Sequence, residues 1–438
     1  MREGTTGESG LLRLLFLVVF CASCSLTGPG DTEELVAELG EKIPPVIAAG
    51  NAPSMQIAVV HRDQIVWSRA FGENTSVDHV YMNASVQKTF TAIAVLQLVD
   101  AGLVDLDADV GDYLPFPVRH PEFPETPITV RMLVAHRSGL DYLPHQFAWD
   151  TESTFAGYRP ACPEELSDMT LEEYVTASLA PGGLNYDPGA WVREPGSAYH
   201  YSVGAYPLLR YLVGRVAGTS YATYLRESIF TPLGMTSSGF SADEFAERHA
   251  IPYTRINGEN IELPLWDGRG SLMHTTAADM ASFMLALMHD DRSDGVQLLQ
   301  PETVELMRRT TTRFRLLFRG GGDDLQRTAQ GLGHSSLRGG WFGIGGSVPG
   351  YQCLFRFRPD RQIGFVLLTN VNAILGGDHN HASARAEIHA VQDALVSVLD
   401  PAYVVRRRAG EIGIIGALIL YFIAVRILVR WRKMRSRR

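Results

Sequence analysis

Lysine is nearly absent from this chain of 438 residues, although basic residues as a whole are not. Of the 39 basic residues only Lys42, Lys88 and Lys433 are lysines, and every other one is an arginine. Arginine stays protonated in proteins, whereas a desolvated lysine can lose its proton and act as a base near neutral pH. A chain that avoids lysine this strongly makes its few lysines candidates for work that a guanidinium cannot do. The surroundings of each lysine decide whether it has such a role.

Cysteine is scarce as well, with four in the whole chain. Cys21 and Cys24 lie in an N-terminal apolar segment, which leaves Cys162 and Cys353 for the folded domain. These spacings fit neither a disulfide framework nor a zinc site, and a single disulfide between the last two stays open. A metal-like Asp-His-Asn-His run at 378–381 is more typical of a solvated loop, so we expect no metal and no cofactor.

An excess of positive charge is also missing. The formal net charge is −9 and the sequence pI is near 5.8, and only the last few residues concentrate basic side chains. This excludes the electrostatic pattern of a nucleic-acid-binding protein. With 45% hydrophobic residues the chain can bury a large core, which fits one large domain or two interleaved lobes.

The N-terminus carries a short apolar segment, Leu11 to Cys24, that ends in small residues. It is too short to span a bilayer comfortably and is typical of the central part of a secretory signal peptide. We therefore predict a signal peptide or N-terminal anchor and linker at 1–30. Lipidation of Cys24 stays open.

A second apolar segment, Ile412 to Val429, is interrupted only by Arg426. The basic residues that follow it are Arg430, Arg432, Lys433, Arg435, Arg437 and Arg438. This predicts a transmembrane helix with a basic cytoplasmic tail at 403–438. Under the positive-inside rule the folded domain at 31–402 lies outside the cytoplasm, in a periplasm or the extracellular medium.

Between the ends, strand patterns flank a mostly helical middle. The pairs Met55–Val60 with Gln64–Phe71 and Tyr351–Phe357 with Gln362–Thr369 are predicted hairpins. The predicted helices are Glu33–Ala49, Ser85–Ala101, Leu171–Leu179, Ala205–Ala217 and Ser383–Leu399. Together they indicate an α/β (α+β) fold: an antiparallel sheet built from N- and C-terminal hairpins, flanked by helices, with an inserted helical lobe. The stretches 147–169 and 314–327 have no readable pattern.

Ser85 and Lys88 stand three residues apart at the start of a predicted helix. This spacing puts both side chains on one helical face. In the first turn, Ser85 also has a backbone N–H and the positive end of the helix dipole, which favour a developing oxyanion.

Ser85-Val86-Gln87-Lys88 is the Ser-x-x-Lys pattern of penicillin-recognising enzymes. From Ala58 to about Leu368 the chain resembles the serine β-lactamase/DD-peptidase superfamily, and within it the class C-like branch. Further segments match in the family's order: Gly102–Asp107, Tyr113–Pro115, Leu133–Leu140, Tyr201–Val203, Pro232–Met235, Ala278–Met280 and Gly345–Tyr351.

The resemblance implies a role for each matched residue. Ser85 attacks the carbonyl carbon, and Lys88 and Tyr201 share the transfer of its proton. The backbone N–H groups of Ser85 and Ser347 form the oxyanion hole, as a serine nucleophile requires. His136 belongs to a structural turn in the family and is not assigned to catalysis.

Two departures from the family pattern bear on the substrate. The Tyr-x-Asn motif is Tyr201-Ser202-Val203 here, and the Lys-Thr-Gly or His-x-Gly motif is Ile344-Gly345-Gly346. Val203 and Ile344 would leave a buried amide or carboxylate unpaired, at a cost of about 1–3 kcal/mol each. Neutral acyl substrates are therefore expected. The superfamily's carboxylesterase branch, often called class VIII, is similar at both motifs.

The leading prediction is therefore an esterase or acyl transferase that acts on a small-molecule ester or amide. A D-amino-acid-directed peptidase or amidase is the first alternative, with the missing cation supplied by His334, Arg338 or Arg313. A β-lactamase and a catalytically idle binding protein on the membrane surface are the others. The sequence does not predict the oligomeric state.

Overall fold

The computed structural model describes residues 31–145, 163–265, 272–288, 296–314, 325, 327–372, 378–405 and 407, with only the backbone at 167 and 378–383. The chain divides into two compact units. One is formed by Met1–Ile43 with Asp393–Arg438 and the other by Pro44–Gln392.

The first unit contains most of α2 (Thr32–Ala48). Leu35, Leu39 and Ile43 are buried, and their spacing of four residues puts them on one face of this helix. The predicted first helix is confirmed, with its start one residue earlier.

The helix α12 (Asp378–Leu399) contributes its last turns to the same unit. It begins five residues before the predicted Ser383, so the interpretation of 378–381 as a loop is wrong. Those residues lack apolar periodicity, but a first helical turn does not need it, and Asp378 is favoured at a helix N-terminus.

The predicted signal segment at 1–30 and the predicted span Ile412–Val429 lie outside the described residues. Within the described part of the chain, no helix is both long and apolar enough to cross a membrane.

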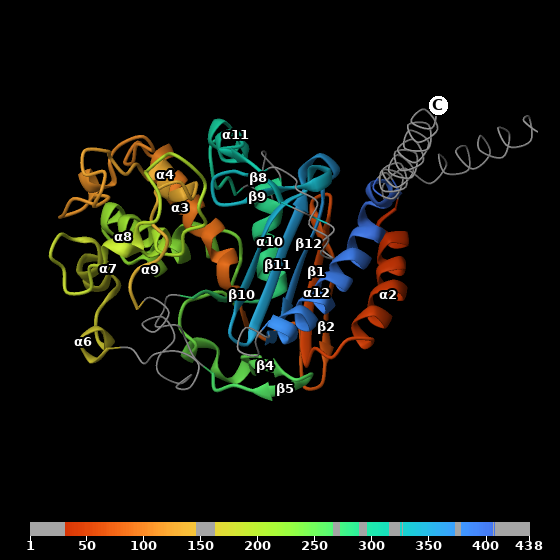
Figure 1. The fold of residues 1–438 in the computed structure, drawn as a ribbon. Coiled ribbons are helices and arrows are strands. Elements are labelled where there is room, and N and C mark those ends of the chain that lie inside the picture. Colours follow the sequence, from red (N-terminus) through yellow and green to blue (C-terminus); the bar gives the residue numbers. More distant parts are fainter. Residues whose placement is uncertain are drawn as a thin grey trace, which may run out of the picture. The chain divides into compact units, whose positions relative to one another are not determined.

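The second unit is built on an eight-stranded antiparallel sheet (Figure 1). Its strand order is β2-β1-β12-β11-β10-β9-β8-β7. In sequence order the strands are β1 (Ser54–His61), β2 (Gln64–Gly72), β7 (Thr312–Arg313), β8 (Arg327–Gln330), β9 (Ser335–Leu337), β10 (Phe342–Val348), β11 (Tyr351–Arg358) and β12 (Ile363–Thr369). β1 pairs with β12 in the register Met55 to Thr369, so the two predicted hairpins are confirmed and lie side by side.

Four strands of this sheet had no readable pattern in the sequence. β7, β8 and β9 are two to four residues long, too short to show an alternation of apolar and polar side chains. β10 contains three glycines, which weaken any strand prediction. All four pair edge to edge with a neighbour, so sheet formation overrides their weak local preference.

Helices gather to the left of β10 in Figure 1. They include α3 (Gln87–Asp100), α4 (Val130–Val134), α6 (Glu164–Ser167), α7 (Leu171–Leu179), α8 (Ala205–Ala217) and α9 (Tyr221–Leu225). α8 contacts α3, α4, α7 and α9 and so forms the centre of the predicted helical lobe. The capping box of Thr170 with Glu173 and the left-handed Gly218 end are both present.

α3 is buried on nearly all sides, as its continuous apolar sequence predicts. Phe90 stacks on Phe283 of α10 (Ala277–Met288) with ring centroids 3.8 Å apart. α10 in turn contacts β1, β2, β11 and β12, so it joins α3 to the sheet.

Two small sheets and one further α-helix also belong to this unit. They are β3 (Tyr81–Met82) with β6 (His274–Thr275), β13 (Val371–Asn372) with β4 (Tyr253–Ile256) and β5 (Glu259–Glu262), and α11 (Pro301–Arg308). The β4–β5 hairpin was missed, although Asn257-Gly258 at its turn is the strongest short hairpin pattern, and both residues have positive φ. Cys353 is a buried free cysteine, and Cys162 lies outside the described residues.

Candidate active site

Ser85 lies in a tight 3₁₀ turn, Ala84–Val86, that runs directly into α3. The predicted single helix from Ser85 is therefore a short turn followed by an α-helix. Ala84 has a φ of 50°, a left-handed conformation that costs a non-glycine residue about 1 kcal/mol or more. Residues in strained backbone conformations cluster at functional sites, because the surrounding fold must hold them in place.

The hydroxyl of Ser85 receives two hydrogen bonds. Lys88 Nζ donates to Ser85 Oγ over 3.2 Å, and Tyr201 OH donates to the same oxygen over 2.9 Å. Lys88 is only 5% exposed, and its Nζ lies 5.4 Å from the ring centroid of Tyr201 and 5.3 Å from that of Tyr206. The structure thus brings together the three residues that the sequence proposed, from the 3₁₀ turn, from α3 and from the segment before α8.

The pKa of the Tyr201 hydroxyl is lowered from its ordinary value. Burial raises this pKa, but the positive charge of Lys88, hydrogen bonding with Ser85 and Lys88, and the charge of Arg327 together outweigh burial. Neighbouring Tyr206 shows the opposite: burial, then the nearby tyrosines, raise its pKa well above the usual range. Of these two tyrosines, Tyr201 is the one whose hydroxyl gives up its proton more readily, and it lies beside Ser85.

His136 packs against Tyr201 and hydrogen-bonds to the backbone of the next residue. It is buried in a left-handed turn with φ of 57°, and its Nδ1 accepts a hydrogen bond from the backbone N–H of Ser202 over 3.0 Å. Its ring lies 4.6 Å from that of Tyr201. Burial, reinforced by the charge of Lys88, lowers the pKa of His136 well below its ordinary value. The neutral ring of His136 accepts the hydrogen bond from the Ser202 backbone and so fixes the segment that carries Tyr201, as expected for a structural residue.

Strand β10 passes directly against the Ser85 turn. A Cβ atom placed on Gly346 would lie 2.5 Å from the Asn83 carbonyl oxygen and 2.9 Å from the Ser85 backbone nitrogen. Only glycine permits this approach, which brings β10 against the backbone of the Ser85 turn, one residue before Ser347. The amide of Asn372 donates to Ser347 Oγ over 2.8 Å and to the Val348 carbonyl over 2.5 Å. The end of β10 is therefore anchored where the resemblance puts an oxyanion donor.

A pocket of about 140 Å³ lies beside Tyr201. Its walls include the predicted substrate residues Ile344 and Gly345, but Val203 is not among the lining residues. The full lining is His136, Tyr201, Tyr206, Arg327, Gln330, Gly333, Ser335, Ile344 and Gly345.

The three cations suggested from the sequence are not among the residues that line this pocket. His334 is buried, and burial lowers its pKa to about 4, so it is neutral at pH 7. Arg327 does line the pocket, and the sequence did not reveal it. It stands at the end of the unreadable stretch 314–327 and is one arginine among many, so only the pairing of β8 with β9 brings it here.

Comparisons with known proteins agree with this geometry. The model of the beta-lactamase family matches residues 33–390. Penicillin-binding protein 4 of Amycolatopsis lactamdurans is 29% identical over 326 residues, which cover 70% of this chain and 76% of that protein. Esterase EstB of Burkholderia gladioli is 33% identical over 220 residues, and the match covers 48% of this chain and 52% of the esterase.

Solved structures share the fold. The D-amino acid amidase of Ochrobactrum anthropi SV3 has a TM-score of 0.62 at 21% identity, over 83% of this chain and 98% of that chain. The serine hydrolase class predicted from Ser-x-x-Lys is thus supported by sequence and by fold. Because the family model spans well over half of its residues, this chain belongs to the beta-lactamase family, within the serine β-lactamase/DD-peptidase superfamily.

Proposed function

We propose that this protein is an esterase or acyl transferase that forms an acyl-enzyme on Ser85 and acts on neutral acyl groups. The observation that carries the proposal is the pair of hydrogen bonds that Lys88 and Tyr201 donate to Ser85 Oγ. A nucleophile with a proton acceptor at this distance is what acyl transfer requires. Esterase EstB, at 33% identity, supports the ester preference.

The proposed steps of acyl transfer begin with the loss of the Ser85 hydroxyl proton. Tyr201 passes its proton to the amine of Lys88 and takes the proton of the Ser85 hydroxyl, while Oγ bonds to the carbonyl carbon of the substrate. The backbone N–H groups of Ser85 and Ser347 stabilise the resulting oxyanion. Tyr201 then gives its proton to the leaving oxygen as the carbon–oxygen bond breaks, and Lys88 returns its proton to Tyr201. Water, or an acceptor alcohol, repeats the sequence and releases the acyl group.

Labelling of the nucleophile tests this proposal. The wild type should react with a fluorophosphonate at Ser85, located by mass spectrometry, and should hydrolyse 4-nitrophenyl butyrate. Ser85→Ala should lose the label and lower kcat by roughly 10³-fold or more, with an unchanged melting temperature. Hydrolysis by Ser85→Ala at the wild-type rate would show that another residue is the nucleophile.

A D-amino-acid-directed peptidase or amidase is the second candidate function. Penicillin-binding protein 4 and the D-amino acid amidase, both similar to this chain, favour it. A fluorescent penicillin distinguishes the two. Stoichiometric acylation of Ser85 by the penicillin, faster than turnover of the butyrate ester, would favour the peptidase.

We also propose that the hydrolase domain lies outside the cytoplasm, held by the apolar segment Ile412–Val429. The support is the sequence of that segment and the six basic residues after it. Alkaline phosphatase, which needs an oxidising compartment for its disulfides, should be active when fused after Leu399 and inactive after Arg438. The opposite pattern would overturn this orientation.

A further inference from the structure

The pocket beside Tyr201 is placed to receive one part of the substrate. It is lined by Tyr201, which in the proposed mechanism gives its proton to the leaving oxygen. It is also lined by Ile344, which lies about 10 Å along β10 from the oxyanion donor Ser347. A substrate whose carbonyl oxygen points to Ser347 and whose leaving oxygen faces Tyr201 would extend its leaving group into this pocket.

Arg327 is the arginine among the residues that line this pocket. It is the first residue of β8, and its Nη1 donates to the hydroxyl of Tyr199 over 3.0 Å. Its guanidinium carbon lies 5.9 Å from the ring centroid of Phe314, which itself meets Tyr199 edge to face. A hydroxyl and an aromatic ring therefore hold the guanidinium in position without neutralising it.

The charge of Arg327 has no counter-ion among the described residues. Other arginines of this chain form ion pairs, such as Arg131 with Asp107 and Arg226 with Glu244, and none of the ion pairs between described residues includes Arg327. Its positive charge is also the smallest of the contributions that lower the pKa of Tyr201 against the effect of burial. A cation beside a pocket that pairs with no described carboxylate favours an anionic ligand.

Two other polar side chains of the pocket, those of Ser335 and Gln330, already have hydrogen-bond partners within the protein. Ser335 Oγ donates to Gln330 Oε1 over 3.0 Å, and Gln330 Nε2 donates to the carbonyl of His334 over 2.8 Å. Ile344 stands where the family has a cation and offers no hydrogen bond from its side chain. Recognition of a charged group in this pocket thus depends on the guanidinium.

We propose that Arg327 binds a carboxylate on the leaving group, so that the preferred substrates are esters of a neutral acyl group with a carboxylate-bearing alcohol or phenol. This inference rests on the proposed function and adds its substrate class. It replaces the expectation, drawn from Ile344, that the whole substrate is neutral. Arginine suits this role because its planar fork forms two parallel hydrogen bonds with a carboxylate.

A matched pair of esters tests the proposal. The acid 5-butyryloxy-2-nitrobenzoic acid and its methyl ester carry the same acyl group and release coloured phenolates, and only the acid has a carboxylate. The wild type should show a kcat/KM at least tenfold higher for the acid, and added NaCl should reduce that preference. Equal specificity constants for the two esters would overturn the proposal.

Variants at two arginines show whether Arg327 causes the preference for the acid over its methyl ester. Arg327→Met should lower the ratio of the two specificity constants by about tenfold, whereas Arg327→Lys should keep part of it. A change in Tyr201 affects both esters and cancels in the ratio. Arg313→Met removes an exposed arginine from the neighbouring strand β7 and should leave the ratio as in the wild type. The same loss in both Met variants would show a general charge effect and contradict a subsite at Arg327.

A binding measurement keeps this test separate from that of the proposed function. Titration of 5-hydroxy-2-nitrobenzoate into Ser85→Ala needs no turnover, and adding Arg327→Met should raise its Kd about tenfold. An unchanged Kd would overturn the subsite even if the esters are hydrolysed. If neither ester is hydrolysed and Ser85 is not labelled, the proposed function is wrong, whatever the titration shows of Arg327.

Discussion

Two side chains donate hydrogen bonds to Ser85 Oγ, and they differ in what they can do with a proton. Tyr201 has its pKa lowered, against the effect of its own burial, mainly by the charge of Lys88. Lys88 is enclosed between the rings of Tyr201 and Tyr206 and close to Ser85. The chain keeps a lysine at this position while using arginine almost everywhere else, which suggests a requirement that charge alone does not meet.

Lys88→Arg tests that requirement. We expect it to lower kcat/KM for 4-nitrophenyl butyrate by roughly 10²–10⁴-fold, nearly as much as Lys88→Ala. A guanidinium cannot accept a proton. It is also larger than an ammonium group, and the site of the Lys88 side chain, which is 5% exposed, has little room for it. Rates of fluorophosphonate labelling measure the acylation step directly. Labelling of Lys88→Arg at the wild-type rate would show that Lys88 acts only as a cation.

At the level of secondary structure elements, the site depends on the contact between β10 and the 3₁₀ turn at Ala84–Val86. β10 reaches the turn because it is held in the sheet by β11 on one side and β9 on the other. Its glycines are what allow the close approach. The two proposed oxyanion donors thus lie on elements that are far apart in sequence, and a small change in their separation should affect catalysis more than stability.

Gly346→Ala tests this contact. The new Cβ would lie 2.5 Å from the Asn83 carbonyl oxygen, so the strand or the turn must move. We expect kcat to fall by roughly 10²-fold, the size of the loss when one oxyanion donor is misplaced. Gly345→Ala is the matched comparison, because its Cβ meets Leu354 Cδ2 at 3.4 Å and no atom more closely. A smaller effect at Gly346 than at Gly345 would contradict the proposed role of this contact.

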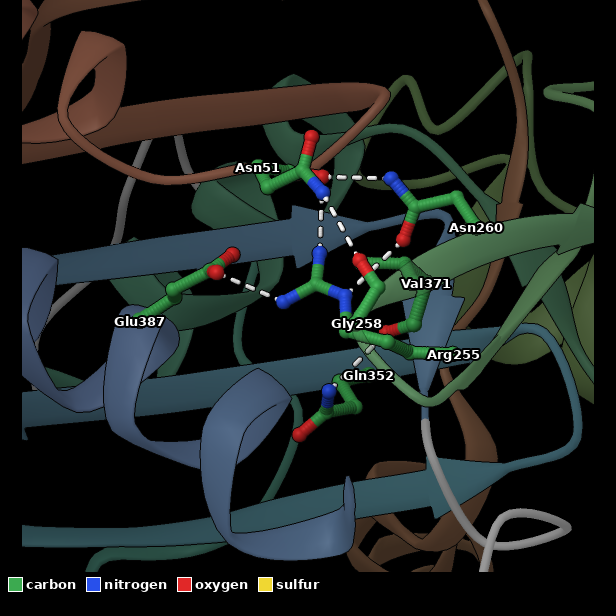
Figure 2. Close-up of polar contacts among 7 residues, drawn as sticks. All are labelled: Asn51, Arg255, Gly258, Asn260, Gln352, Val371 and Glu387. Atoms are coloured by element: carbon green, nitrogen blue, oxygen red, sulfur yellow. Dashed lines mark hydrogen bonds and ion pairs between the residues drawn. The ribbon is translucent and has the colours of Figure 1, made fainter.

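At the level of the whole molecule, buried polar residues connect segments that are distant in sequence. Figure 2 shows Arg255 of β4 with its guanidinium between Glu387 of α12 and the backbone of Asn51. It donates to Glu387 Oε1 over 2.5 Å, to the Asn51 carbonyl over 2.7 Å and to Asn260 Oδ1 over 2.9 Å. The Arg255 side chain is 2% exposed, so these contacts compensate a charge that water does not reach.

Arg255→Met should therefore destabilise the fold by about 3 kcal/mol, because it leaves Glu387 without its counter-ion. Urea unfolding measures the loss, and Arg255→Met with Glu387→Met should recover part of it. Arg309→Met is the control. Arg309 pairs with Glu305 at the surface, where both side chains are more than two-thirds exposed, and its loss should cost less than about 1 kcal/mol. Equal losses at both positions would contradict the argument from burial.

Buried histidines should make the molecule sensitive to acid. Burial lowers the pKa of His249 and of His334 to about 4, from 6.5 for an ordinary histidine. The unfolded chain binds protons below pH 6.5 that the folded chain does not, so the free energy of unfolding should fall as the pH drops from 6.5 to 4. The slope is up to about 1.4 kcal/mol per pH unit for each histidine.

His334→Leu removes one of these groups. Its Nε2 has no hydrogen-bond partner within the described structure, so the substitution should have a modest effect at pH 7. Urea unfolding at pH 7, 5.5 and 4.5 should then show a smaller loss of stability with acid than in the wild type. An identical loss in both proteins would show that other groups control the acid sensitivity.

The sequence by itself determined the parts of this protein that depend on local patterns. The hairpins β1–β2 and β11–β12 and the helices α3, α7 and α8 follow from alternation, helical periodicity and capping residues close in the chain. The family and its serine hydrolase chemistry followed from the resemblance carried by Ser85-Val86-Gln87-Lys88 and the matched segments after it. The spacing of three residues in a helical turn also predicts that Ser85 and Lys88 share a face.

Only the tertiary structure decided what surrounds that chemistry. The pairing of β10 with β9 and of β9 with β8, strands too short or too rich in glycine to predict, brings Arg327 beside Ile344 and Tyr201. The same folding buries His334, which the sequence offered as a cation, and so keeps it neutral. Charge state and proximity across a sheet depend on burial and on strand order, and neither is set by residues that are near each other in the chain.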